Sequence, residues 1–260
     1  MKKISVFLVL ITLLSACTPL NAAATQPETL TVFAAASLTE SFTELKQIFE
    51  SNHPDVRVVF NFAGAQQLQE QIAQGAQADV FASASHKYMD LAIESGSVSG
   101  NSVRLFVTNR LVIIYPNGNP AGLQKLEDLA NPGLKLILAD EAVPVGKYSL
   151  EFMDKTGNSA YKNAVLANVV SYEDNVKSVL TKVALGEADA GIVYVSDITP
   201  EASTQVGKIE IPDPFNVIAE YPISPITGSR HPELAADFIN LVLSPEGQAV
   251  FQAHNFIPVD

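Results

Sequence analysis

Cysteine is nearly absent from this chain of 260 residues, since Cys17 is the only one. An intramolecular disulfide is therefore excluded. Basic residues are also scarce, with 16 Lys and Arg against 28 Asp and Glu and a formal net charge of −12. Binding to nucleic acid requires a basic surface, which this composition does not provide. The negative field also opposes anionic ligands, so local dipoles would have to hold any anion that binds.

The sequence lacks the short motifs of common catalytic and metal sites. It contains no H-E-x-x-H, C-x-x-C, P-loop, G-x-G-x-x-G or G-x-S-x-G pattern. The histidines stand far apart in sequence, which favours separate surface residues over a metal site. They are His53, His86, His231 and His254. An exported hydrolase that uses Ser37 or Tyr194 is a weak alternative, because no general base is evident near either residue.

Long apolar runs are missing except at the N-terminus. Two lysines precede the run Ile4–Leu14, whose 11 residues are too few to span a bilayer. The stretch Leu14–Cys17 that follows resembles the lipobox of bacterial lipoproteins, in which the cysteine is lipid-modified and becomes the mature N-terminus. We predict a signal peptide at residues 1–16, a lipid on Cys17 and a tether at residues 17–28, which would hold the protein at the outer face of a bacterial membrane. An ordinary secretory signal with an incidental cysteine is the alternative.

Strand and helix patterns alternate along the rest of the chain, which predicts an α/β fold. Leu30–Phe33 is apolar on both faces, as in a buried parallel strand. A helix is predicted to follow, because apolar residues recur at helical spacing. These residues are Leu38, Phe42, Leu45 and Phe49. Ser37 and Glu40 form the pattern of a capping box at the start of this helix. Ser37 is thus expected where a strand ends and a helix begins, and open α/β sheets bind ligands at such points.

Two features predict two lobes instead of one. Val103–Val107 and Arg110–Tyr115 are predicted strands on either side of Thr108-Asn109, and they interrupt the alternation near the middle of the chain. Two prolines make Glu220–Ile226 an extended segment that suits a second crossing between lobes. We expect each lobe to be a mostly parallel sheet flanked by helices, with the ligand cleft between the lobes. The predicted ranges are residues 29–107 with 226–260 for lobe I and residues 108–225 for lobe II.

Five places along the chain are candidates for one common site, most of them at junctions between strands and helices. Small residues leave backbone N–H groups open to a ligand there, and the positive end of a helix dipole favours an anion. The candidates are Ser37, Ala63–Gln66, Val143–Tyr148, Asp174–Val176 and Tyr194. Each one alone has a simpler explanation, as a helix cap, a packing position or a half-buried core residue. Their order and spacing together point to a shared cleft.

Five stretches carry a family resemblance. They are VFAAASL (Val32–Leu38), ADVFASAS (Ala78–Ser85), VPVGKY (Val143–Tyr148), EDNVKSVL (Glu173–Leu180) and EADAGIVYVSD (Glu187–Asp197). With them, nearly the whole mature chain resembles the molybdate-binding proteins of bacterial ABC importers, which are two-lobed substrate-binding proteins of type II. The resemblance implies an α/β fold like that of periplasmic binding proteins, in a monomer that is not an enzyme and uses no cofactor. It also implies molybdate or tungstate as the ligand, and an ABC permease and its ATPase as partners.

The resemblance further implies which groups hold the ligand. That family binds a tetrahedral oxyanion with hydroxyls and backbone N–H groups, without a cationic side chain. Ser37 and Tyr194 would give hydroxyls, and Val145 and Val176 would give amides. The fifth position is usually a serine, but Ala65 stands there, so only its amide can donate. This departure leaves a related oxyanion open as the ligand, and a signalling sensor instead of a permease is a further alternative.

Overall fold

A computed structural model describes residues 27–259 of the chain. The predicted signal peptide, Cys17 and nearly all of the predicted tether lie outside these described residues. Within residues 27–259, no helix is both long enough and apolar enough to cross a membrane. The signal peptide, the lipid on Cys17 and the tether therefore stay predictions.

Strands and helices alternate through most of the described chain, as the sequence predicted. The strands are β1 (Glu28–Ala35), β2 (Val56–Ala63), β3 (Val80–Ala82), β4 (Arg104–Pro116), β5 (Leu136–Ala139), β6 (Val169–Glu173), β7 (Ala190–Tyr194), β8 (Val206–Glu210), β9 (Ile218–Pro225) and β10 (Ile257–Pro258). The α-helices are α1 (Thr39–Asn52), α2 (Ala65–Ala73), α3 (His86–Glu94), α4 (Pro144–Lys155), α5 (Ser159–Ala167), α6 (Val176–Ala184), α7 (Pro232–Leu243) and α8 (Pro245–Ala253). A 3₁₀ turn at Ala36–Leu38 joins β1 to α1.

The main strands form a continuous hydrogen-bonded sheet with the order β2-β1-β3-β9-β4-β7-β5-β6. β1 pairs in parallel with β2 and β3, and β5 pairs in parallel with β6 and β7. The pairings at the centre are antiparallel, and they join β9 to β3 and β4, and β4 to β7 and β8. Both ends of the sheet are thus parallel as predicted, whereas the strands that join the two ends are antiparallel.

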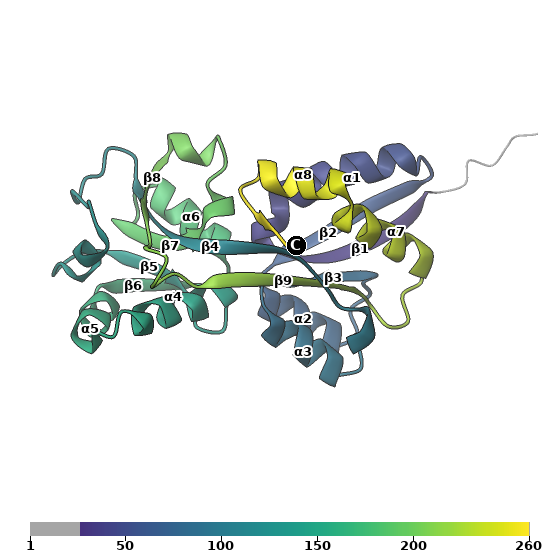
Figure 1. Ribbon diagram of the computed structural model, residues 1–260, viewed down its shortest axis with the longest axis horizontal. Coiled ribbons are helices and arrows are strands. Elements are labelled where there is room, and N and C mark those ends of the chain that lie inside the picture. Colours follow the sequence, from purple (N-terminus) through teal and green to yellow (C-terminus); the bar gives the residue numbers. More distant parts are fainter. Residues whose placement is uncertain (1–26, 260) are drawn as a thin grey trace, which may run out of the picture.

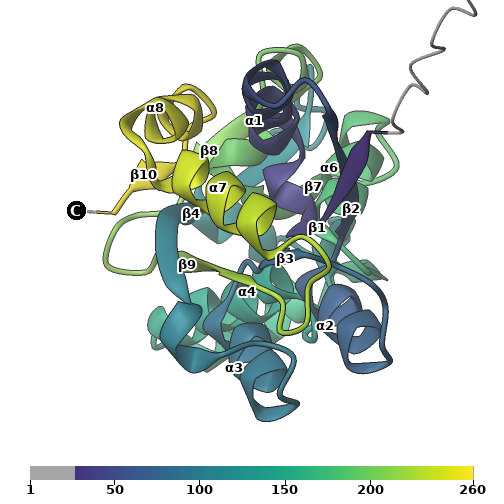
Figure 2. The same ribbon diagram turned by 90° about the vertical axis from the view of Figure 1, so that its right-hand side faces the viewer.

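The sheet carries two lobes, one at each end (Figure 1). Lobe I consists of β1–β3, α1–α3, α7 and α8, and lobe II consists of β5–β8 and α4–α6, while β4 and β9 run between them. In lobe I, α1, α7 and α8 cover one face of the sheet, and α2 and α3 cover the other (Figures 1 and 2). In lobe II, α6 lies on one face, and α4 and α5 lie on the other (Figure 1). This is the two-lobed α/β architecture expected from the sequence.

The predicted pair of strands around Thr108-Asn109 is wrong, because β4 is a single unbroken strand. Both residues pair with β9, so they continue the strand instead of turning it. The buried side-chain amide of Asn109 makes two hydrogen bonds. It donates to Ser196 Oγ at 2.7 Å and accepts from the N–H of Arg110 at 2.9 Å. One long strand therefore joins the lobes where two strands were expected. The residue ranges of the lobes stay predictions.

Aromatic packing fixes α1 against the sheet of lobe I. The apolar residues that predicted this helix are all buried: Leu38, Phe42, Leu45 and Phe49. The ring of Phe42 lies 5.7–6.1 Å from four other phenylalanine rings, measured between centroids. These are Phe60, Phe106, Phe238 and Phe251, from β2, β4, α7 and α8. Fully burying one such side chain stabilises the fold by roughly 1.5–3 kcal/mol. The turn that precedes α1 is therefore held in a fixed place.

Candidate functional site

The five predicted site residues line one small cavity between the lobes. Ser37 and Ala65 reach it from lobe I, and Val145, Val176 and Tyr194 reach it from lobe II. The other lining residues are mostly small or apolar: Ala35, Ala36, Ala63, Gly64, Ala84, Val143, Pro144 and Asn175. The cavity volume is about 20 Å³, and a cavity that holds one water molecule needs about 10–15 Å³ on the same scale. The cavity therefore suits a compact ion and not a sugar or a peptide.

Three of the lining residues bring backbone N–H groups from the first turns of helices. Ala65, Val145 and Val176 lie at the starts of α2, α4 and α6. N–H groups in a first turn have no partner inside the helix, and these three are paired with no acceptor of the described chain. At α6 the side chain of Asn175 caps the helix, because it accepts from the N–H of Ser178 at 3.0 Å and leaves Val176 free. The open N–H groups and the helix dipoles favour an anion in the cavity.

Ser37 is not the helix cap that its capping-box pattern predicts. It lies inside the 3₁₀ turn, and the N-cap of α1 is Leu38, which makes no side-chain cap bond. Because the chain already turns before α1 begins, Ser37 precedes the capping position. Glu40, the other half of the predicted pattern, pairs with Lys177 instead. The hydroxyl of Ser37 is thus released from capping and is available to other partners.

The hydroxyl of Tyr194 is an unusual polar group. Tyr194 ends β7, and only 1% of its surface is exposed. Its hydroxyl has no hydrogen-bond partner among the described residues, although buried polar groups are nearly always paired. Burial raises the pKa of Tyr194 well above its usual value, and the nearby Tyr221 raises it further. The hydroxyl therefore keeps its proton. The site therefore contains a buried donor that an acceptor ligand would satisfy.

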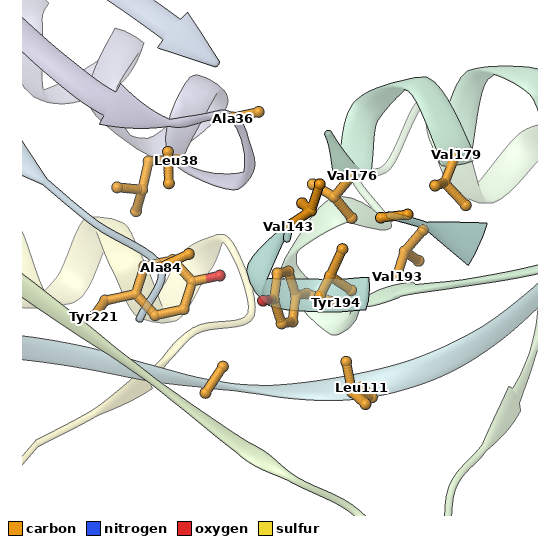
Figure 3. Packing of buried hydrophobic residues seen from close by; sticks show 14 of the residues in the cluster. Ala36, Leu38, Ala84, Leu111, Val143, Val176, Val179, Val193, Tyr194 and Tyr221 are labelled. Carbon is orange, nitrogen blue, oxygen red and sulfur yellow. The ribbon is translucent and has the colours of Figure 1, made fainter. Parts of the chain in front are cut away.

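Tyr221 on β9 is a buried residue of this region that the sequence did not predict. Its hydroxyl lies 2.9 Å from Ser37 Oγ. Its ring centroid lies 6.0 Å from that of Tyr194, with the ring planes at 68°. Figure 3 shows the two tyrosine hydroxyls turned toward each other between the lobes. The only sequence signal for Tyr221 is its place in the predicted crossing Glu220–Ile226.

Among the described residues, no charged side chain lines the cavity, but an ion-pair network lies beside it. Lys177 Nζ, next to Val176 in the chain, lies 3.3 Å from Asp197 Oδ1 and 2.8 Å from Glu40 Oε2. Burial lowers the pKa of Lys177, but the carboxylates of Asp197 and Glu40 outweigh this effect and leave the pKa raised. Burial raises the pKa of Asp197, against the opposing effect of Lys177. Because Glu40 belongs to α1 and Lys177 to α6, the network joins the two lobes.

Further contacts hold the lobes together around the cavity. Gln66 Nε2 on α2 donates to the carbonyl of Asp174 at 2.8 Å, and Gln67 Nε2 donates to the Asp174 carboxylate at 3.3 Å. The hydroxyl of Tyr88 on α3 donates to the carbonyl of Ala142. Each of these bonds runs from lobe I to a segment of lobe II beside the cavity. The described conformation is therefore closed.

The family of the chain follows from comparison with known proteins. Residues 30–257 match the family described as bacterial extracellular solute-binding protein. The chain belongs to this family. A solute-binding protein is not an enzyme, so that expectation is confirmed and the hydrolase alternative falls. The family resemblance inferred from the motifs is confirmed as well, whereas the roles of the five lining residues stay predictions.

Individual relatives agree with this assignment. The molybdate-binding protein ModA of Mycobacterium tuberculosis is 37% identical over 227 residues, which cover 87% of this chain and 84% of the relative. A protein named as a lipoprotein, YvgL of Bacillus subtilis, is 28% identical over 261 aligned positions, which cover 98% of each chain. The solved periplasmic molybdate-binding protein of Azotobacter vinelandii matches with a TM-score of 0.78 and 19% identity, over 89% of this chain and 100% of that one. This last likeness confirms the fold expected for a periplasmic binding protein.

Proposed function

We propose that this solute-binding protein binds molybdate, or the similarly sized tungstate, outside the cytoplasm and delivers it to the permease and ATPase of an ABC importer. The 37% identity to a protein named as molybdate-binding supports the ligand class. The small size of the cavity between the lobes supports it independently. A fully deprotonated tetrahedral oxyanion is compact, and its oxygens only accept hydrogen bonds, which matches a lining that offers donors.

The observation that carries the proposal is the buried, unpartnered hydroxyl of Tyr194. An oxyanion in the cavity would accept from this hydroxyl and from Ser37, and from the amides of Ala65, Val145 and Val176. Each charge-assisted hydrogen bond contributes about 1.5–3 kcal/mol. After the costs of desolvation and lobe closure, we expect a net binding free energy of roughly −8 to −12 kcal/mol, which is micromolar to nanomolar affinity.

The lining also supports a choice among oxyanions. Every group that we assign to the ligand is a donor, and no carboxylate of the described chain lines the cavity. Protonated phosphate carries an O–H that needs an acceptor, so we expect it to bind poorly. Ala65 offers one hydroxyl fewer than the serine usual in the family. This departure makes another proton-free oxyanion, such as sulfate, the second candidate ligand.

Isothermal titration of the purified mature domain tests the proposal. We expect molybdate and tungstate to bind tightly, and phosphate to give no heat at neutral pH. A thermal-shift panel that adds sulfate and chromate ranks the related oxyanions, because a ligand that binds only the native state stabilises it by RT ln(1 + [L]/Kd). Phosphate binding comparable to molybdate binding, or no response to molybdate, would contradict the proposal.

We infer that ligand binding closes the lobes, with residues 29–107 and 226–260 moving against residues 108–225. The bonds of Gln66 to Asp174 and of Lys177 to Glu40 support this inference, because they exist only when the lobes meet. A closed liganded form would give the permease a shape to select. Small-angle scattering should show a smaller radius of gyration with molybdate than without it. An unchanged radius would count against closure.

We further propose that the mature protein is a monomer anchored by a lipid on Cys17. The lipobox-like stretch and the 28% identity to a named lipoprotein support the anchor. Cys17→Ala should release the protein from membranes, and mass spectrometry of the native protein should find the lipid. The sensor alternative predicts a neighbouring histidine kinase gene, whereas import predicts neighbouring permease and ATPase genes.

A further inference from the structure

Tyr221 does not line the cavity, yet it touches a group that we assign to the ligand. Its hydroxyl lies 2.9 Å from Ser37 Oγ, and the side chains of Asn109 and Tyr194 are its other polar neighbours. The side chain of Tyr221 is fully buried. Edge-to-face contacts with Phe106 and Phe256 hold its ring, with centroids 6.3 and 5.5 Å away. The Tyr221 hydroxyl is therefore fixed in place and has Ser37 as its neighbour.

A count of protons decides the direction of this hydrogen bond. Each hydroxyl has one proton to donate. If Ser37 donated to Tyr221, Ser37 would have no proton left for an anion, and an oxyanion in the cavity would lose one of its donors. If Tyr221 donates to Ser37, both protons find acceptors once an anion fills the cavity. A buried hydrogen bond left unmade is costly, so the second arrangement is the stable one with ligand bound.

We propose that Tyr221 is a positioning residue for oxyanion binding, which donates to Ser37 Oγ and thereby turns the Ser37 proton into the cavity. This inference rests on the proposed function, because it concerns how the same site presents one of its donors. Tyr221 acts only through Ser37, since it lies behind the lining and not in it. Tyr194 reaches the cavity from lobe II, and its hydroxyl, which faces that of Tyr221 (Figure 3), makes no hydrogen bond among the described residues.

Two physical effects follow from a donated bond to Ser37. Hydrogen bonds in a chain polarise one another, so the bond from Tyr221 makes Ser37 a stronger donor. A hydroxyl that is already oriented also loses less freedom when the ligand binds. Both effects matter here because alanine stands at position 65, which leaves Ser37 as the only hydroxyl that lobe I brings to the described lining of the cavity.

A double-mutant cycle with molybdate as the probe tests the inference. Tyr221→Phe removes one oxygen and keeps the packed ring. In the otherwise unmodified protein it should weaken molybdate binding roughly 2- to 12-fold, which is the value of one neutral hydrogen bond. In protein that carries Ser37→Ala it should cause no further loss, because its effect passes through Ser37. The matched control is Tyr161→Phe, which removes a hydroxyl that donates to the carbonyl of Leu126 at 2.9 Å outside the cavity. It should leave the affinity unchanged.

Equal losses in both backgrounds, or no loss in either, would overturn the inference. Failure of the unmodified protein to bind molybdate would instead refute the proposed function, because Tyr221 is intact there. If Tyr221→Phe does not melt cooperatively, a crystal structure of the unmodified protein with molybdate decides. The inference requires Ser37 Oγ within hydrogen-bond distance of both the Tyr221 hydroxyl and a molybdate oxygen. It is overturned if Ser37 has turned away from Tyr221.

Discussion

The two walls of the cavity hold their hydroxyl groups in different ways. On the wall from lobe I, Ser37 lies in a short turn, and its oxygen is already bonded to Tyr221. On the wall from lobe II, Tyr194 is equally buried, but its hydroxyl is bonded to nothing in the described chain. Lobe I is thus prepared before a ligand arrives, whereas lobe II holds an unmet donor that a ligand would satisfy.

This difference indicates which wall of the cavity gains a hydrogen-bond partner when a ligand binds. A buried donor without a partner costs about 1–3 kcal/mol, whereas a typical hydrogen bond stabilises by about 0.5–1.5 kcal/mol. A ligand that accepts from the Tyr194 hydroxyl therefore removes that cost from the closed form, whereas the bond between Ser37 and Tyr221 is made within the chain. Removing either cavity hydroxyl should weaken binding. Only Ser37→Ala breaks a hydrogen bond within the described chain, so it should lower the stability of the free protein more than Tyr194→Phe does.

The largest expected effect is that of Tyr194→Phe. It removes a charge-assisted hydrogen bond worth about 1.5–3 kcal/mol, so molybdate affinity should fall ~10- to 150-fold. The unfolding free energy of the free protein should change little, because the Tyr194 hydroxyl has no hydrogen bond within the described chain to lose. Titration calorimetry measures the first change and urea unfolding the second. Unchanged affinity would mean that Tyr194 is a core residue and not a ligand.

Ser37→Ala should weaken molybdate binding by about tenfold, near the lower end of the same range, because it removes one of five proposed donors and leaves the other four in place. It also leaves the buried Tyr221 hydroxyl without its partner. The unfolding free energy of the ligand-free protein should therefore fall by about 1 kcal/mol or more. The comparison of the two walls fails if Ser37→Ala and Tyr194→Phe lower the melting temperature of the free protein equally.

Local sequence patterns predicted the parts of the site that depend on local structure. Val143–Tyr148 and Asp174–Val176 were candidate sites at predicted strand-to-helix junctions, and α4 and α6 begin within these ranges. Helical spacing of apolar residues predicted the buried face of α1, which fixes the turn that carries Ser37. Strand-to-helix junctions and the family resemblance then selected five residues that the fold brings to one cavity.

Contacts between distant segments account for what the sequence did not predict. The bond between Ser37 and Tyr221 joins residues 184 positions apart, and the bond between Lys177 and Glu40 joins residues 137 apart. No local pattern contains either bond. The capping box failed for a related reason, because a 3₁₀ turn moved Ser37 ahead of the cap. The strands β8 and β10 were missed as well, and both form by pairing with β4, which lies far away in the sequence.

A smaller effect is expected for the ion pair that joins the lobes. Glu40→Gln removes the charge that Lys177 meets across the cleft at 2.8 Å. The side chains are partly exposed, and such pairs contribute roughly 0.2–1 kcal/mol, so affinity should fall by about 1.5- to 5-fold. The loss should appear as faster dissociation, because the pair forms only in the closed state. Stopped-flow kinetics would measure it.

Glu151→Gln is the matched control for that substitution. Its partner Lys147 lies one turn away in the same helix, with 3.4 Å between the charged atoms. The net charge therefore changes equally, but no contact between the lobes is lost. High salt should shrink the effect of Glu40→Gln, since screening weakens the pair. Equal effects of the two variants would show that long-range charge, and not the contact between lobes, controls dissociation.

The smallest expected effect is that of alkaline pH on binding. Burial raises the pKa of both Tyr194 and Tyr221, so both hydroxyls keep their protons in the folded protein where a free tyrosine would ionise. Molybdate affinity should therefore stay flat from neutral pH to about pH 10, the usual pKa of tyrosine.

The stability of the fold depends on pH in a different way, because the folded pKa values of both tyrosines lie above the unfolded ones. The contribution of these two tyrosines to the unfolding free energy is fully present below about pH 10. It is lost as the pH rises further, because the unfolded chain then releases protons that the folded chain keeps. Calorimetry and urea unfolding over this pH range measure the two quantities separately. A fall in affinity that precedes the fall in stability would show that one of the two hydroxyls ionises in the folded site, and neither wall would then act as a neutral donor.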